Sequence, residues 1–196
     1  LEEEDEILLP EAGTTDYGNT ASLCMAEKEY HNLAYPLDMK MTVESERGRC
    51  AAAMAGYPIE EKLSLKDMST AEAKILYAKK EDGAYYFGVD TGMLYGKEIS
   101  GIRKGMVKQG CLTVTDEWTF EEEHPIGVVW LSYEPWKTDQ ENKMAVSGRK
   151  ILRVTCEESW EFQIEEGFVD HDLNPLYVLR VVTKQGKFHQ VTSEFS

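Results

Sequence analysis

The phrase "VTDEWTF" (residues 114–120) returns in similar form as "VTCEESWEF" (residues 154–162), and both stretches alternate apolar and polar side chains. Side chains of a β-strand point alternately to the two faces of a sheet, so this period of two predicts strands. Asp116 interrupts the apolar face of the first strand, and Glu158 interrupts that of the second. The two phrases therefore predict two strands of one antiparallel sheet and mark two carboxylates among apolar neighbours.

Strand-like patterning continues through most of the sequence after Gly83. Asp82-Gly83 and Gln185-Gly186 each separate two such runs and predict hairpin turns. No stretch alternates strands with long helices, which disfavours a doubly wound parallel sheet. We expect a mainly β, β-rich α+β fold: a curved antiparallel sheet or a β-barrel with one or two N-terminal helices. The expected strands after Gly83 are residues 84–89, 111–120, 126–133, 149–156, 159–166, 176–184 and 187–195.

The N-terminal part has a different character. Residues 1–20 open with "LEEEDE" and predict an acidic flexible arm. Residues 43–55 carry apolar side chains at helical spacing, followed by a Gly and a Pro that predict the end of a helix. The 196 residues suit one domain. The predicted organisation is an arm over residues 1–20 and a single β-rich domain over residues 21–196.

Charge limits the classes of partner. The formal net charge of −15 repels phosphate backbones, so nucleic acid is a poor partner. No apolar run reaches the roughly 20 residues that a membrane-spanning helix needs, so we expect a soluble, acidic protein without a membrane span. The sequence begins with Leu1, which suggests a chain processed from a longer precursor or trimmed, and the sequence does not indicate a compartment.

The four cysteines lack the spacing of a structural zinc site. They permit either free thiols or disulfides. Cys24 and Cys50 lie in the less regular N-terminal part and are our first choice for a disulfide, whereas Cys111 and Cys156 lie in expected strands.

Arg180 is the most informative residue because it lies inside the apolar run "LYVLRVV". A buried unpaired charge is costly, so we expect Arg180 to face a carboxylate, with Asp116 and Glu158 as candidates, or a ligand. Two interpretations remain open. Either these charges only pair with each other, or they share a partly apolar ligand cavity with four aromatic side chains: Trp118, Phe120, Trp160 and Phe162.

Two polar segments resemble weaker motifs. "EEEHP" (residues 121–125) places acids beside a histidine, but its position between expected strands favours a solvated loop over a metal site. "DHDLN" (residues 170–174) begins like a calcium loop and lacks the later glycine and glutamate, so we expect a polar turn. No catalytic triad or nucleophile motif is present. We expect no metal ligands, and the sequence does not identify a cofactor.

Three functional hypotheses follow. The first is a non-enzymatic, β-barrel-like carrier of a small, partly apolar ligand, held by Arg180 and the side chains named with it; an anionic ligand would suit Arg180. The second is a β-rich protein-interaction module that uses surface aromatics of "WLSYEPW", namely Trp130, Tyr133 and Trp136. The third and least favoured is an enzyme with Asp116 or Glu158 as general base.

Overall fold

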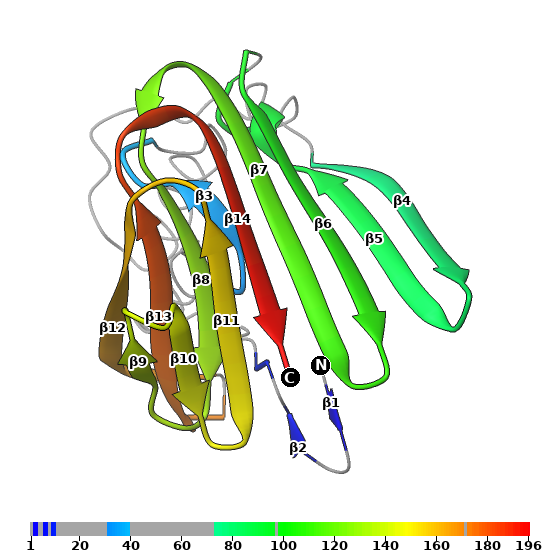
Figure 1. Ribbon diagram of the computed structural model, residues 1–196, viewed down its shortest axis with the longest axis vertical. Helices are drawn as coiled ribbons and strands as arrows, with labels where there is room; N and C mark the ends of the chain where they lie inside the picture. Colours follow the sequence, from blue (N-terminus) through cyan, green and yellow to red (C-terminus); the bar gives the residue numbers. More distant parts are fainter. Residues whose placement is uncertain are drawn as a thin grey trace, which may run out of the picture.

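The computed structural model describes residues 2–3, 6–7, 9–10, 31–39, 73–96, 98–170 and 172–196. These residues form a large and a small antiparallel sheet, neither of them closed into a barrel (Figure 1). The expected mainly β fold is confirmed in its curved-sheet form. The expected helix at 43–55, and nearly all of the expected arm at 1–20, lie outside the described residues. Within the described part of the chain, helical structure is limited to a 3-10 turn at Gly92–Leu94.

The large sheet has eight strands, and all adjacent pairs are antiparallel. In spatial order the strands are β4 (Lys74–Glu81), β5 (Ala84–Asp90), β6 (Ser100–Lys108), β7 (Cys111–His124), β14 (Gly186–Phe195), β11 (Lys150–Cys156), β10 (Met144–Ser147) and β9 (Lys137–Asp139).

The small sheet has four strands in the order β12 (Trp160–Val169), β13 (Pro175–Thr183), β8 (Ile126–Ser132) and β3 (Ala34–Pro36). A separate two-stranded pair near the N-terminus consists of β1 (Glu2–Glu3) and β2 (Glu6–Ile7).

The hairpin expected at Asp82-Gly83 is confirmed, whereas the one expected at Gln185-Gly186 is wrong. Asp82 and Gly83 have φ angles of 49° and 75°, the left-handed pair that a tight two-residue turn requires. At the second position, residues 184–185 connect β13 of the small sheet to β14 of the large sheet, and these two strands do not pair with each other. A Gly-containing dipeptide between two strand-forming runs thus marks a hairpin at the first position and a crossing between the two sheets at the second.

The main core lies between the two sheets. Every second residue of β7 points inward, from Leu112 through Trp118 to Phe120, as the alternation predicts. These side chains pack with the inner faces of β8, β11, β13 and β14. A second cluster lies on the opposite face of the small sheet and consists of Tyr35, Val129, Leu131, Leu176 and Val178.

Strand β6 was not among the expected strands because its glycines resemble turn signals. Two of them face aromatic rings instead. A Cβ atom at Gly101 would lie 2.5 Å from the Trp118 ring, and one at Gly105 would lie 2.1 Å from the Phe87 ring. Here glycine is required by close packing of a ring against the sheet.

The β4–β5 hairpin forms one end of the large sheet, at the edge remote from the strands of the small sheet (Figure 1). All eight residues of β4 are exposed. Among the described residues, this arrangement leaves the outer edge of β4 without a neighbouring strand and its side chains exposed.

Candidate functional site

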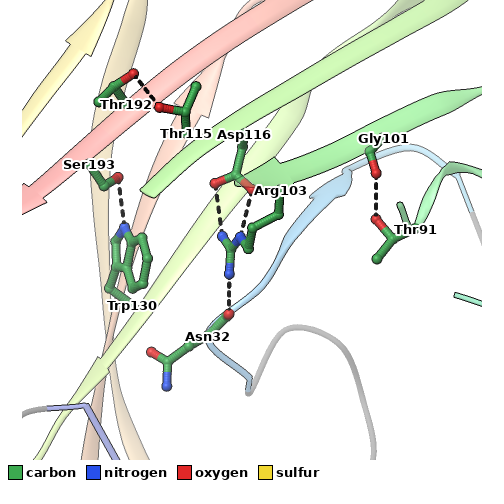
Figure 2. A network of polar contacts seen from close by, with 9 residues as sticks. All are labelled: Asn32, Thr91, Gly101, Arg103, Thr115, Asp116, Trp130, Thr192 and Ser193. Atoms are coloured by element: carbon green, nitrogen blue, oxygen red, sulfur yellow. Dashed lines mark hydrogen bonds and ion pairs between the residues drawn. The ribbon is translucent and has the colours of Figure 1, made fainter. Parts of the chain in front are cut away.

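Asp116 has its own partner in the large sheet. The residue directly opposite on β6 is Arg103, whose Nε and Nη2 donate to Oδ1 and Oδ2 of Asp116 at 2.6 and 2.8 Å (Figure 2). Asp116 is 1% exposed. A two-pronged Arg–carboxylate pair of this geometry satisfies the buried charge. The expected pairing of Asp116 with Arg180 is therefore wrong.

Arg103 also ties the N-terminal segment to both sheets. Its Nη1 donates to the carbonyl oxygen of Asn32 (Figure 2), and its guanidinium lies 5.2 Å from the ring centre of Trp130. The Asn32 side chain accepts a hydrogen bond from the Leu131 amide at 2.8 Å and donates to the Pro10 carbonyl at 2.7 Å. The network thus joins β6, β7 and β8 to residues near the start of the chain, and its role is to hold these elements together.

Glu158 pairs with His189, which the sequence analysis did not single out. His189 is fully buried, and its Nε2 lies 2.7 Å from the carbonyl oxygen of His124 and 3.2 Å from that of Gly186. Carbonyl oxygens only accept, so Nε2 carries a proton. Nδ1 contacts the Glu158 carboxyl group. The available signal was the alternation of β14, which places His189 on the apolar face with Val191.

Arg180 lies on the other face of the small sheet. It is 7% exposed and shares its face with Val178 and Leu176 of the second cluster. Its Nη1 donates to Oε1 of Glu165 on the neighbouring strand β12. Its expected burial against a carboxylate is confirmed, but neither expected candidate is the partner.

Burial by itself would lower the pKa of Arg180. The hydrogen bond that Arg180 donates to Glu165, together with the interaction with Tyr35, outweighs burial and raises that pKa. Arg180 Nε has no hydrogen-bond partner among the described residues. Asp116, Glu158 and Arg180 are therefore held in three separate pairs, and Arg180 does not share a space with the aromatic residues of the main core.

The four aromatic residues expected around a cavity pack into the main core. Trp118 stacks on Phe120 with ring centres 5.8 Å apart, and Trp160 meets Phe162 edge to face at 4.8 Å. Trp118 is 1% exposed, and its Nε1 has no hydrogen-bond acceptor in the described part of the chain. Among these four aromatic residues, the Trp118 N–H is the buried polar group that has no hydrogen-bond partner in the described part of the chain.

Two of the three expected surface aromatics are buried, and Tyr133 is half-buried. Trp130 and Trp136 are 2% and 5% exposed, and their indole N–H groups donate to Ser193 Oγ and the Tyr177 carbonyl. Each indole N–H is therefore satisfied within the sandwich. The interaction hypothesis that rests on these two residues as exposed anchors is wrong.

Tyr133 holds the polar turn at residues 170–174. Its hydroxyl donates to Oδ2 of the fully buried Asp170 at 2.7 Å, and burial followed by this bond raises the pKa of Tyr133 to about 12. Burial alone would raise the pKa of Asp170, but bonds from Asn174, Tyr133 and two backbone amides lower it overall. The expected polar turn is confirmed, and its carboxylate is occupied internally.

The segment expected as the loop "EEEHP" instead belongs largely to β7, which extends to His124. His124 Nδ1 lies 3.0 Å from Asp38. Among the described residues, no group of three or more His, Cys, Asp or Glu side chains is placed to hold a metal ion. The same residues contain no helix long and apolar enough to cross a membrane.

The thiols of Cys111 and Cys156 are free. Burial raises the pKa of Cys156, which disfavours the reactive thiolate. Cys24 and Cys50, the expected disulfide pair, lie outside the described residues.

An exposed apolar surface occurs on the β4–β5 hairpin. Its members, which we call the β4–β5 surface, have exposed fractions of 72% (Ile75), 40% (Leu76), 38% (Tyr77) and 55% (Tyr85). Lys80 lies 4.8 Å from the ring centre of Tyr85. Residues 74–90 contain three Lys and no Arg against three Asp and Glu, whereas the chain has 21 Lys and Arg against 36 Asp and Glu. The surface is thus apolar and carries balanced charge on an acidic protein.

Comparison with known proteins places the fold but not the family. No family model and no curated protein sequence matches the chain. Among solved structures, a heparinase III gene product superposes with a TM-score of 0.68 at 10% identity, covering 95% of this chain and 28% of that one. Heparan sulfate lyase HepC from Pedobacter heparinus gives 0.60 at 12% identity, with 96% and 28% coverage. The chain therefore shares its fold with a little over a quarter of these longer proteins.

Proposed function

We propose that this chain is a non-enzymatic protein-interaction module that binds its partner through the β4–β5 surface. The observation that carries the proposal is β4 itself, an end strand with eight exposed residues and adjacent large apolar side chains. Exposed large apolar side chains and a strand edge left unpaired among the described residues are both features that often mark a contact surface. The partner class is protein, because a strand edge offers main-chain hydrogen bonds that another polypeptide can complete.

The internal pairing of the charged residues supports this proposal over the carrier hypothesis. Asp116, Glu158 and Arg180 were the polar groups expected to orient a ligand, and each has a protein partner. A side chain already held by its own salt bridge would have to break that bond to bind a ligand.

The indole N–H of Trp118, which has no acceptor among the described residues, favours one second candidate, the carrier of a small, partly apolar ligand with a hydrogen-bond acceptor. Arg180 would take no part in such a site because it lies on the far face of the small sheet. Native mass spectrometry of the purified chain tests this candidate. A copurifying small molecule that is lost in Trp118→Phe would support it, and an unliganded mass for both proteins would refute it.

The similar solved structures support the proposal only through the fold that they share with this chain. Their titles name heparinase III and a heparan sulfate lyase. A net charge of −15 repels a polyanionic sulfated chain, so the substrate in those titles is a poor candidate ligand for this chain. The fold forms just over a quarter of each of those proteins, which fits a module that functions beside other polypeptide.

Site-specific photo-crosslinking tests the proposal. A photoreactive amino acid replaces Leu76, and the matched control carries it at Thr155, an exposed residue of the same sheet on β11. Both proteins are irradiated in an extract of the cells that produce the chain. We expect a discrete cross-linked protein from position 76 that disappears when Ile75→Lys and Tyr85→Lys are added. Equal cross-linking from both positions, or no effect of the two lysines, would refute the proposal.

A further inference from the structure

The outer edge of β4 has a defined set of available backbone groups. In a two-residue hairpin the residues flanking the turn are hydrogen-bonded to each other, so Glu81 bonds to Ala84 of β5. Bonding alternates along an antiparallel strand. Lys79 therefore also bonds to β5, whereas the N–H and C=O groups of Lys80 and Ala78 point away from the sheet.

A β-bulge shifts this alternation further along β4. The register changes between Ile75 and Tyr77, so that Tyr77 lies opposite Gly88 and Ile75 lies opposite Val89. One extra residue on β4 means that Ile75, not Leu76, is the next residue whose backbone groups point outward. The outward set is Ile75, Ala78 and Lys80.

We propose that the partner of β4 is a second copy of this chain, paired antiparallel through β4 about a two-fold axis at Ala78. This inference rests on the proposed function and names the partner. In that arrangement Ala78 faces Ala78 of the other copy, and Ile75 faces Lys80 in both directions. All three outward residues then meet outward residues, because the bulge is repeated symmetrically on both strands. The contact is isologous and closes as a dimer.

The side chains are complementary in this register. Continuing one residue beyond the Ile75–Lys80 pairs places Lys74 opposite Glu81, twice per dimer, and no lysine faces another lysine. Lys80 lays its apolar stem along Ile75, as long basic side chains do. At the centre, the small Ala78 side chains allow close approach. A register centred on Lys80 would instead place two lysines face to face, and it would pair only the tip of the hairpin.

Lysines and a bulge on an edge strand commonly prevent strand pairing. Here the same features select one register, since the bulge aligns the outward groups and the lysines meet Glu81, Ile75 and the adjoining apolar positions. The existing contact of Glu81 with Lys79 is a fully exposed pair, with side chains 57% and 56% exposed, and it can be exchanged at little cost.

Sedimentation equilibrium of the purified chain over a wide concentration range measures the association. We expect a concentration-dependent monomer–dimer equilibrium. Ala78→Pro removes an outward N–H but none that bonds to β5, so it should abolish the dimer and keep the monomer fold. The matched control is Ala78→Val, which retains the N–H and should retain the dimer. Circular dichroism confirms that both variants are folded.

A charge exchange tests the register itself. Lys74→Glu places like charges opposite each other twice per dimer and should raise the dissociation constant by about tenfold. Adding Glu81→Lys restores opposite charges in the exchanged orientation and should recover the original value to within about threefold. Failure of the double variant to recover would overturn the register at Ala78.

The outcomes separate this inference from the proposed function. Suppose that the chain stays monomeric at all concentrations, while position 76 still cross-links a different protein and this cross-link depends on Ile75 and Tyr85. That result overturns the inference and leaves the proposed function standing. A monomeric chain with no such cross-link overturns both. A dimer unaffected by Ala78→Pro overturns the inference and assigns self-association to another surface.

Discussion

Arg103→Met tests whether the buried pair with Asp116 is a structural element of the sandwich. The substitution keeps an unbranched apolar stem and removes the guanidinium that donates to both carboxylate oxygens. Asp116 is 1% exposed, and Arg103 is 14% exposed at its side chain. A carboxylate left alone at that depth costs about 3–5 kcal/mol. For a domain of this size that loss lowers Tm by roughly 10 °C.

The assay is urea unfolding followed by tryptophan fluorescence and circular dichroism, with both probes required to agree. The double variant Arg103→Met with Asp116→Leu removes both charges. Because replacing a buried pair by apolar side chains is often neutral, it should recover at least about 2 kcal/mol of the loss. Asp116→Asn alone should cost less than Arg103→Met, because the remaining guanidinium is partly exposed and still donates to the Asn32 carbonyl. A loss below about 1 kcal/mol for Arg103→Met would refute the reasoning.

Three further predictions concern other parts of the sandwich. Asp170→Asn should lower the free energy of unfolding near neutral pH. The difference in unfolding free energy from the parent should narrow as pH falls below 3.8, because the folded-state pKa of Asp170 lies below that ordinary value and the stabilisation by its carboxylate is lost on protonation. A difference that does not change with pH would contradict this. Arg180→Met should cost only about 1–2 kcal/mol, since its carboxylate partner is partly exposed, and adding Asp116→Asn should give no rescue in the same urea assay. Gly105→Ala should cost about 1–3 kcal/mol by forcing the Phe87 ring aside, and Phe87→Leu should recover part of it; an unchanged midpoint would show that the ring moves freely.

Much of the fold was predictable because alternation is a local property. The apolar and polar residues of β7 assign each side chain to a face without knowledge of the rest of the chain, and all five inward positions from Leu112 to Phe120 are buried. The Asp82-Gly83 turn was predictable for the same reason, since its backbone angles favour that dipeptide. Strand β6 was missed because Gly101 and Gly105 serve ring packing, a contact between strands that local sequence does not reveal.

The pairing of charges was not predictable, because it depends on which strands are neighbours. Burial of Arg180 followed from its apolar run, but its partner lies on β12, and nothing local to either strand records that neighbourhood. Asp116 meets Arg103 only because β6 lies beside β7. The exposure of β4 was equally hidden, since the consecutive apolar residues Ile75, Leu76 and Tyr77 resemble a buried strand and are exposed only because the sheet ends there.

The central claim is that the chain associates through the outer edge of β4, and residue-resolved amide hydrogen exchange at low and high protein concentration tests it most directly. The amides of Ala78 and Lys80 point outward, while the amide of Lys79 between them bonds to β5 and serves as an internal control. The account predicts that exchange at Ala78 and Lys80 slows as concentration rises, with Lys79 much less affected. Exchange at Ala78 and Lys80 that stays fast and independent of concentration would contradict it.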